Sequence, residues 1–235
     1  MNIKLNWLVA YLAMFIALLS LGVWQIHRAD EKQAYLDLQS QRSGQFVDLT
    51  APSTAGDITQ LRYKSATLTG SYDTTRQFLL DNQIQDGRVG YFVLTPFKLK
   101  DTNKAILVNR GWVPLIEPRT TLPSVALNEL PEELTVTGRL NAFPSVGIKL
   151  KDATQPTQTE PSVIEVLDHS VLSQALGYDL FDFQLELNSD ASYGYVRNWR
   201  ITTLIPPEKH LAYALQWFAL ALVLTVMFIK MALKK

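Results

Sequence analysis

The chain has 235 residues, a formal net charge of +0 and 47% hydrophobic residues. The balanced charge gives no basic surface footprint, which argues against a protein that binds nucleic acid. The chain has no cysteine, which excludes disulfides, thiolate nucleophiles and cysteine-ligated zinc or iron–sulfur sites. With only three histidines (His27, His169 and His210), an all-histidine metal site is also disfavoured.

The first apolar run extends from Trp7 to Val23 and is long enough to cross a lipid bilayer as a helix. Trp7 and Trp24 lie near its two ends, where aromatic side chains often sit at the level of the headgroups. A cleaved signal peptide is the alternative. However, Lys4 is the only basic residue before the run, and no small-x-small cleavage site follows it. We therefore predict an uncleaved transmembrane helix over residues 6–25.

The second apolar run lies at the C-terminal end and predicts a transmembrane helix over residues 210–230. Both tails carry lysine, which favours the cytoplasmic side of a membrane. These lysines are Lys4, Lys230, Lys234 and Lys235. Arg28 and Lys32 follow the first run and argue for the opposite orientation, but long loops cross membranes largely regardless of charge. We expect both termini to be cytoplasmic and residues 26–209 to form an extracytoplasmic domain.

The middle of the chain has the pattern of one mainly antiparallel β domain with minor helix, an α+β fold. Its predicted strands are Tyr63–Thr69, Arg76–Asp81, Gly90–Leu99, Lys104–Trp112, Glu133–Leu140 and Phe181–Leu187. These strands follow one another without long helices between them, which is typical of antiparallel sheets. In the last strand apolar and polar residues alternate, so we expect Asp182, Gln184 and Glu186 to face solvent.

The segments between the strands carry helix, turn and loop signals. Residues 28–42 tolerate helix and predict an extension of the first apolar helix. A short helix is expected to begin at Asp168 or Ser170 and to stop at Gly177. A hairpin is predicted around residues 100–103. The other predicted connections are a turn at residues 82–87 and loops at residues 48–57, 113–130 and 145–161.

No residue pattern in the chain supports catalysis. Nucleophilic hydrolysis needs a base beside an activated nucleophile, and no Gly-x-Ser-x-Gly turn is present. A phosphate cradle needs a glycine-rich turn that opens a helix, whereas residues 86–90 lead into a predicted strand. We therefore expect a protein that is not an enzyme. A membrane-anchored enzyme outside the cytoplasm is the alternative from another class.

An arginine, a glycine and a tryptophan are packed together directly after the apolar strand segment 105–108. Gly111 permits backbone angles that other residues resist, and Trp112 supplies a large apolar area. Arg110, which follows Asn109, can fork onto a carboxylate or a propionate. The alternative is purely structural: a strand end fixed by a core tryptophan and an internal ion pair.

His210 stands alone at the start of the second apolar run. An ionisable residue at a membrane helix is a functional candidate by default, and a neutral imidazole can bind haem iron axially. Tyr213 and Trp217 follow at i+3 and i+7, on the same helix face. The alternative is that His210 bonds lipid headgroups and the two aromatic residues anchor the helix at the interface.

Several short motifs occur in a specific order between the two apolar runs. They are Leu21-Gly22-Val23-Trp24-Gln25 with Arg28 and Lys32, Gly90-Tyr91 leading to Thr95-Pro96, Ile106 to Pro114, Val136-Thr137-Gly138-Arg139, and His210-Leu211-x-Tyr213-Ala214 with Gln216-Trp217-Phe218. Over its whole length the chain resembles the Surfeit-locus (Shy-type) family of cytochrome c oxidase assembly proteins.

The resemblance implies a multi-pass protein of the cell inner (plasma) membrane whose central domain is periplasmic. It implies a biogenesis factor that assists haem a insertion into, or stabilisation of, the catalytic subunit of a haem–copper oxidase. The expected partners are that subunit, haem a synthase and the lipid bilayer, with haem a bound transiently. A pure scaffold for the nascent subunit, which never binds haem, is the alternative.

The resemblance also places the haem site. The family histidine at the second helix falls on His210, which becomes the candidate axial ligand. Tyr213 and Trp217 are the candidate ring contacts, and Arg28 and Arg200 flank the helices where haem propionates need cations. The residues assigned to the structural motif are Gly22, Trp24, Asn109, Arg110, Gly111 and Trp112.

Overall fold

A computed structural model describes residues 5–49, 57–144, 152–199 and 205–234. The chain divides into two compact units. The first unit, residues 1–40 with 200–235, is here called the helix pair, and the second, residues 41–199, is called the β-domain. Two apolar terminal helices thus flank a β-rich domain.

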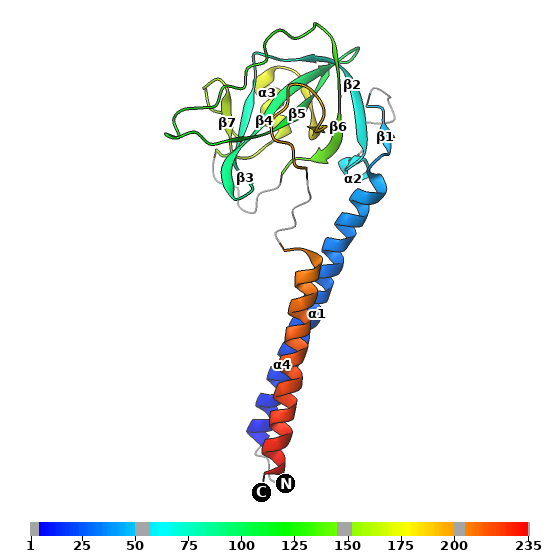
Figure 1. The fold of residues 1–235 in the computed structure, drawn as a ribbon, viewed down its shortest axis with the longest axis vertical. Helices are drawn as coiled ribbons and strands as arrows, with labels where there is room; N and C mark the ends of the chain where they lie inside the picture. Colours follow the sequence, from blue (N-terminus) through cyan, green and yellow to red (C-terminus); the bar gives the residue numbers. More distant parts are fainter. Residues whose placement is uncertain (1–4, 50–56, 145–151, 200–204, 235) are drawn as a thin grey trace. The chain divides into compact units, whose positions relative to one another are not determined.

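Two long apolar helices form the helix pair (Figure 1). Helix α1 spans Leu5–Arg42 and confirms the predicted helical extension beyond the first apolar run. Helix α4 spans Pro207–Leu233 and begins three residues before the predicted start. Proline is favoured at the first helical position because it lacks the amide hydrogen that would be unpaired there. Both helices are long and apolar enough to cross a membrane.

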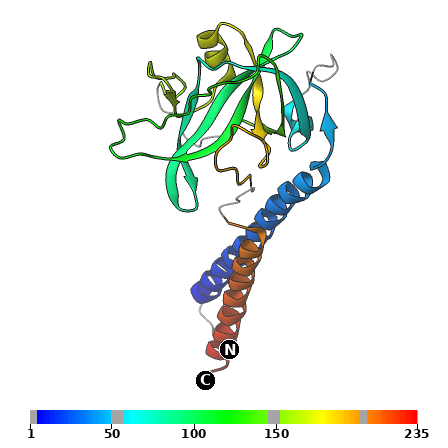
Figure 2. The same cartoon turned by 45° about the horizontal axis from the view of Figure 1, so that its top comes forward.

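The two helices pack through a seam of residues spaced alternately three and four apart. On α1 this series is Tyr11, Phe15, Leu18, Gly22, Gln25 and Ala29, and on α4 it is Pro207, His210, Ala214, Trp217, Ala221, Leu224 and Phe228. Leu19, Phe218 and Thr225, each next to a member of the series, are also less exposed. This spacing is that of a coiled coil, in which successive seam residues face the partner helix. Tyr11 stacks on Phe228 at 4.2 Å between ring centroids and bonds Thr225 at 3.0 Å. Because Tyr11 meets the end of α4, the helices run antiparallel, side by side (Figures 1 and 2).

Five strands of the β-domain close into a barrel. Around the barrel they are β2 (Ser65–Tyr72), β6 (Leu134–Ala142), β8 (Asp179–Leu187), β5 (Lys104–Pro114) and β4 (Arg88–Leu99). The pairing of Gly70 with Leu99 joins β4 back to β2 and closes the ring. All neighbouring pairs in the ring are antiparallel except β5–β8, which confirms a mainly antiparallel sheet.

Shorter elements extend the barrel. Strand β3 (Phe78–Gln85) pairs with β4, and β7 (Ser162–Ile164) adds to β3 in parallel. Strand β1 (Phe46–Val47) adds to β2 in parallel, and α2 (Ile58–Leu61) precedes β2. The sequence patterns did not predict β1, β7 or α2. Helix α3 (His169–Leu176) is confirmed, with the Asp168 carboxylate accepting from two amides at its start and Gly177 left-handed at its end.

The turn predicted at residues 82–87 is wrong in its extent. Strand β3 continues to Gln85, and the connection to β4 is the two-residue turn Asp86-Gly87. Both turn residues have positive φ, as an Asp-Gly hairpin turn requires. The loop predicted at residues 113–130 begins two residues late, after Pro114, and carries no strand or helix. Residues 50–56 and 145–151 of the other two predicted loops lie outside the described residues.

The barrel interior holds the largest apolar cluster of the β-domain. It includes Leu68 of β2, Phe97 of β4, Val108 of β5 and Leu185 of β8, all of them fully buried. Inward-facing residues therefore come from every side of the ring, as alternation along each strand requires.

Candidate functional site

His210 lies on the seam of the helix pair and is only 7% exposed. Its Nδ1 is 2.7 Å from Oε1 of Gln25, which comes from α1. An amide oxygen only accepts hydrogen bonds, so Nδ1 carries the hydrogen and donates it. In a neutral imidazole of this tautomer, the other ring nitrogen, Nε2, keeps a lone pair. Nε2 is therefore the ring nitrogen with the chemistry of a ligand.

The aromatic residues predicted beside His210 occupy different places on α4. Trp217 is half-buried on the seam, whereas Tyr213 is 43% exposed. Ala214, four residues after His210, takes the buried position on the next turn. The structure therefore groups Trp217 with His210 along the seam and leaves the Tyr213 ring largely uncovered within the helix pair.

The remaining predicted residues of the helix pair have clear local roles. Arg28 forms an ion pair with Glu31 at 2.6 Å, and its guanidinium lies 5.8 Å from the ring centroid of Trp24. Gly22 faces Phe218: a Cβ at Gly22 would lie 2.5 Å from the Phe218 ring. The absence of a side chain at Gly22 thus lets the two helices approach closely. Arg200 lies outside the described residues.

Arg110 is buried in the β-domain and is held by uncharged acceptors. Its Nε donates to the Tyr193 carbonyl at 2.7 Å, and its Nη1 donates to Gln77 Oε1 at 2.9 Å and to the Val125 carbonyl at 3.0 Å. Burial lowers the pKa of Arg110 from its ordinary value. Among the described residues no carboxylate forms an ion pair with it. The guanidinium thus holds together the segments of Tyr193, Gln77 and Val125. Because Arg110 is only 2% exposed, it is not accessible to an external propionate.

Gly111 and Trp112 fix a covering segment onto strand β5. This segment, residues 188–199, is called the strap. The backbone of Trp112 pairs with that of Val196 in a β-bridge, and Gly111 has φ +115. The Trp112 indole donates to the Gln83 carbonyl at 2.9 Å. The contacts of Arg110, Gly111 and Trp112 agree with the structural interpretation, in which these residues fix the end of a strand. The expected ion pair of Arg110 is absent from the described contacts, and carbonyl and amide oxygens accept its hydrogen bonds instead.

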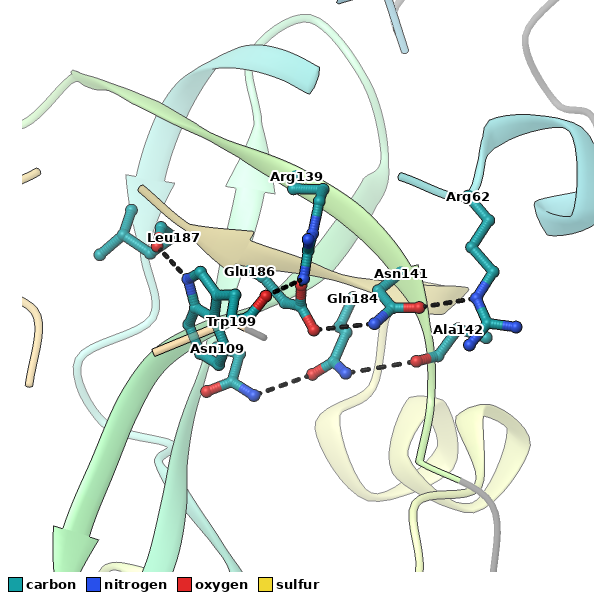
Figure 3. A network of polar contacts seen from close by, with 9 residues as sticks. All are labelled: Arg62, Asn109, Arg139, Asn141, Ala142, Gln184, Glu186, Leu187 and Trp199. Carbon is teal, nitrogen blue, oxygen red and sulfur yellow. Dashed lines mark hydrogen bonds and ion pairs between the residues drawn. The ribbon is translucent and has the colours of Figure 1, made fainter. Parts of the chain in front are cut away.

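A polar network joins β6 and β8 to Trp199 of the strap (Figure 3). Glu186 of β8 accepts from Arg139 at 2.5 Å and from Asn141 at 2.8 Å, both on β6. Arg139 also donates to the carbonyl of Trp199, whose indole donates to the Leu187 carbonyl at 2.7 Å. The strap is thus bonded to β6 and β8 by charged and neutral groups together.

The network extends to both sides of the Glu186 pair (Figure 3). Arg62 donates to the Asn141 amide oxygen at 2.9 Å. Asn109, on β5, donates to Gln184 of β8 at 3.2 Å. Each of these polar side chains therefore has a hydrogen-bond partner, as buried polar groups require.

The solvent-facing prediction for β8 is wrong at two of three positions. Asp182 is exposed, but Gln184 is 2% exposed and Glu186 is 7% exposed. Gln184 bonds Asn109 and the Ala142 carbonyl. Glu186 bonds Arg139, which also donates to the Trp199 carbonyl of the strap. In the sequence, Arg139 was named only as part of a motif and Asn141 was not named, although Arg139 stands directly opposite Glu186 in the β6–β8 register.

Within the described residues, no group of three or more histidine, cysteine, aspartate or glutamate side chains is placed to hold a metal ion. A model of the SURF1 family matches residues 12–222, which include parts of both apolar helices and the whole β-domain. The chain belongs to the SURF1 family. This confirms the family resemblance that the order of the motifs indicated.

Curated SURF1 relatives match nearly the full length. A SURF1-like protein of Rickettsia bellii is 29% identical over 230 residues, covering 92% of this chain and 87% of the relative. The Surfeit locus protein 1 of Xenopus tropicalis is 24% identical over 249 residues, covering 98% and 76% respectively. SURF1 proteins are known broadly as cytochrome oxidase assembly factors.

Proposed function

We propose that this SURF1 protein is a membrane-anchored, non-enzymatic biogenesis factor that holds haem a for the catalytic subunit of a haem–copper oxidase. The observation that carries the proposal is the His210–Gln25 hydrogen bond, which leaves a ligand nitrogen on a seam between two apolar helices. Family membership and the two apolar helices support the same role. Haem a is then cargo, received and passed on.

The residues present fit such a cargo by their donor chemistry. Iron in haem accepts a single histidine nitrogen in several protein classes, and Nε2 of His210 has the required lone pair. The small exposed fraction of His210 keeps water from the imidazole. Apolar helices suit a ring that is poorly soluble in water. Arg28, although paired with Glu31, is 45% exposed and remains the described cation of α1 closest in sequence to Gln25.

Optical spectra test this proposal directly. The full chain is co-expressed with a haem a synthase, purified in mild detergent, and compared with His210→Ala. We expect a haem a band in the wild type and its loss, tenfold or more, in the variant, because the axial ligand is gone. His27→Ala is the matched control: His27 also lies on the helix pair but is exposed, and its variant should keep the band.

Two outcomes would contradict haem handling at His210. A band that persists in His210→Ala would place the haem elsewhere. Absence of the band from the wild type, while the oxidase subunit still co-purifies, would favour the pure scaffold instead.

We also propose that α1 and α4 cross the inner membrane, with both termini cytoplasmic and the β-domain periplasmic. The chain has no cysteine, so single introduced cysteines report their side without background. Asn103→Cys lies in the exposed β4–β5 hairpin, and Lys234→Cys lies just after α4. A membrane-impermeant maleimide added to intact spheroplasts should label Asn103→Cys at least tenfold more than Lys234→Cys. Equal labelling after permeabilisation is the control, and the reverse preference would overturn the topology.

A further inference from the structure

Gln25 is the polar partner of His210 across the helix pair. We propose that Gln25 is a positioning residue: its amide oxygen holds the hydrogen on Nδ1 of His210 and thereby presents Nε2 to the iron of the cargo. The inference rests on the proposed haem handling for its use, but the hydrogen bond and the tautomer that it sets are properties of the chain alone.

The seam explains why Gln25 reaches His210. Gly22 and Ala29 lie three residues before and four residues after Gln25 on α1, and both are buried. Two small residues on the same face let α4 come close, so that a side chain between them spans the gap. A larger residue at either place would move the amide away from the imidazole.

The chemistry of His210 and Gln25 determines which of them donates the hydrogen bond. His210 is 7% exposed, so its imidazole has little access to water as an alternative partner. An imidazole that donates through Nδ1 to an oxygen is fixed both in tautomer and in ring orientation. Histidines that bind metals commonly make such a bond through the nitrogen that does not bind, and its removal weakens metal affinity about 10–100-fold.

The other groups near this face do not take the role of Gln25. Arg28 and Glu31, three and six residues further along α1, are paired with each other at 2.6 Å. His27 is exposed. Among the described residues, Gln25 is therefore the hydrogen-bond partner that the structure gives to the His210 ring.

The first measurement needs no haem. Full-length protein with ¹⁵N-labelled histidine, in mild detergent, is examined by NMR for the protonated ring nitrogen of His210, assigned with His210→Ala. We expect the hydrogen on Nδ1 in the wild type. Gln25→Leu removes the acceptor and should abolish this preference, whereas Gln25→Glu keeps an acceptor oxygen at the same chain length and should retain it. A wild-type hydrogen on Nε2, or an unchanged preference in Gln25→Leu, would overturn the inference.

The second measurement titrates haem a into the same preparations and follows the absorption band. Gln25→Leu should weaken binding about 10–100-fold, and Gln25→Glu should restore most of it. The matched control is Gln33→Leu: Gln33 lies on α1 but bonds Asp37 of its own helix, so its variant should bind as the wild type does. Equal affinity of Gln25→Leu and the wild type would contradict a positioning role.

The two measurements separate this inference from the proposed function. If the wild type binds no haem a but shows the Gln25-dependent tautomer, haem handling fails and the positioning of His210 stands. If haem a binds through His210 and Gln25→Leu changes neither tautomer nor affinity, haem handling stands and the role of Gln25 is refuted.

Discussion

Arg139→Met is expected to lower the free energy of unfolding of the β-domain by about 3–5 kcal/mol, the usual cost of leaving a buried charge without its partner. Arg139 donates through Nε and Nη2 to one carboxylate oxygen of Glu186, at 2.8 and 2.5 Å. Their side chains are only 16% and 8% exposed. The variant would leave the buried Glu186 carboxylate without Arg139 and remove the bond to the Trp199 carbonyl. Denaturant unfolding of the full chain in detergent, followed by tryptophan fluorescence, measures the loss.

Two controls show whether the cost comes from burial of the charge. The double variant Arg139→Met, Glu186→Leu should recover much of the lost stability, because neither charge is then left unpaired. Lys100→Met breaks the ion pair of Lys100 with Glu133, whose side chains are 51% and 50% exposed, and should change stability far less. If the double variant is as unstable as Arg139→Met, the loss of stability comes from lost packing rather than from an unpaired buried charge.

The sequence predicts most elements of the fold because their signals are local. The two apolar helices, the β4–β5 hairpin and α3 with its Asp168 cap all depend on residues a few positions apart. The closed ring is different, since β8 must pair with both β5 and β6, far away in the chain. No local sequence pattern predicts the order of the strands around the ring. The burial of Glu186 was missed for the same reason, because its partner Arg139 lies on a strand far away in the chain.

The sequence was enough to nominate His210 as a candidate ligand, but it did not indicate which residue contacts the His210 ring. His210 could be proposed from its place at an apolar helix and from the family motif around it. Its partner Gln25 lies 185 residues away, and the pairing follows from the register between α1 and α4. That register depends on the fit of Gly22 against Phe218, which is a packing property. Similarly, Arg110 was recognised as unusual, but its carbonyl partners come from the strap and from a segment after β5.

The contact between the strap and Gly111 predicts a second large loss of stability. Gly111→Ala is expected to lower the free energy of unfolding of the β-domain for two reasons, backbone strain and a clash with the strap, whose contributions add. A φ of +115 is a conformation in which a residue with a Cβ is strained by about 1–3 kcal/mol. The new Cβ would also lie 2.8 Å from the Val196 carbonyl oxygen and 3.0 Å from the Tyr195 carbonyl carbon. These are backbone atoms of the strap, so relief requires moving the strap, at a further cost of about 1–3 kcal/mol.

Gly44→Ala separates the two costs. Gly44 also has positive φ, +104, but nothing lies within 4 Å of the Cβ that alanine would add. The same unfolding measurement on both variants should therefore show the strain alone at Gly44 and the strain plus displacement of the strap at Gly111. In Gly111→Ala the displaced strap should also expose the indole of Trp199 to a soluble fluorescence quencher, because its bond to the Leu187 carbonyl holds it in place. Equal losses in the two variants, with Trp199 still protected, would mean that the strap does not depend on the close approach at Gly111.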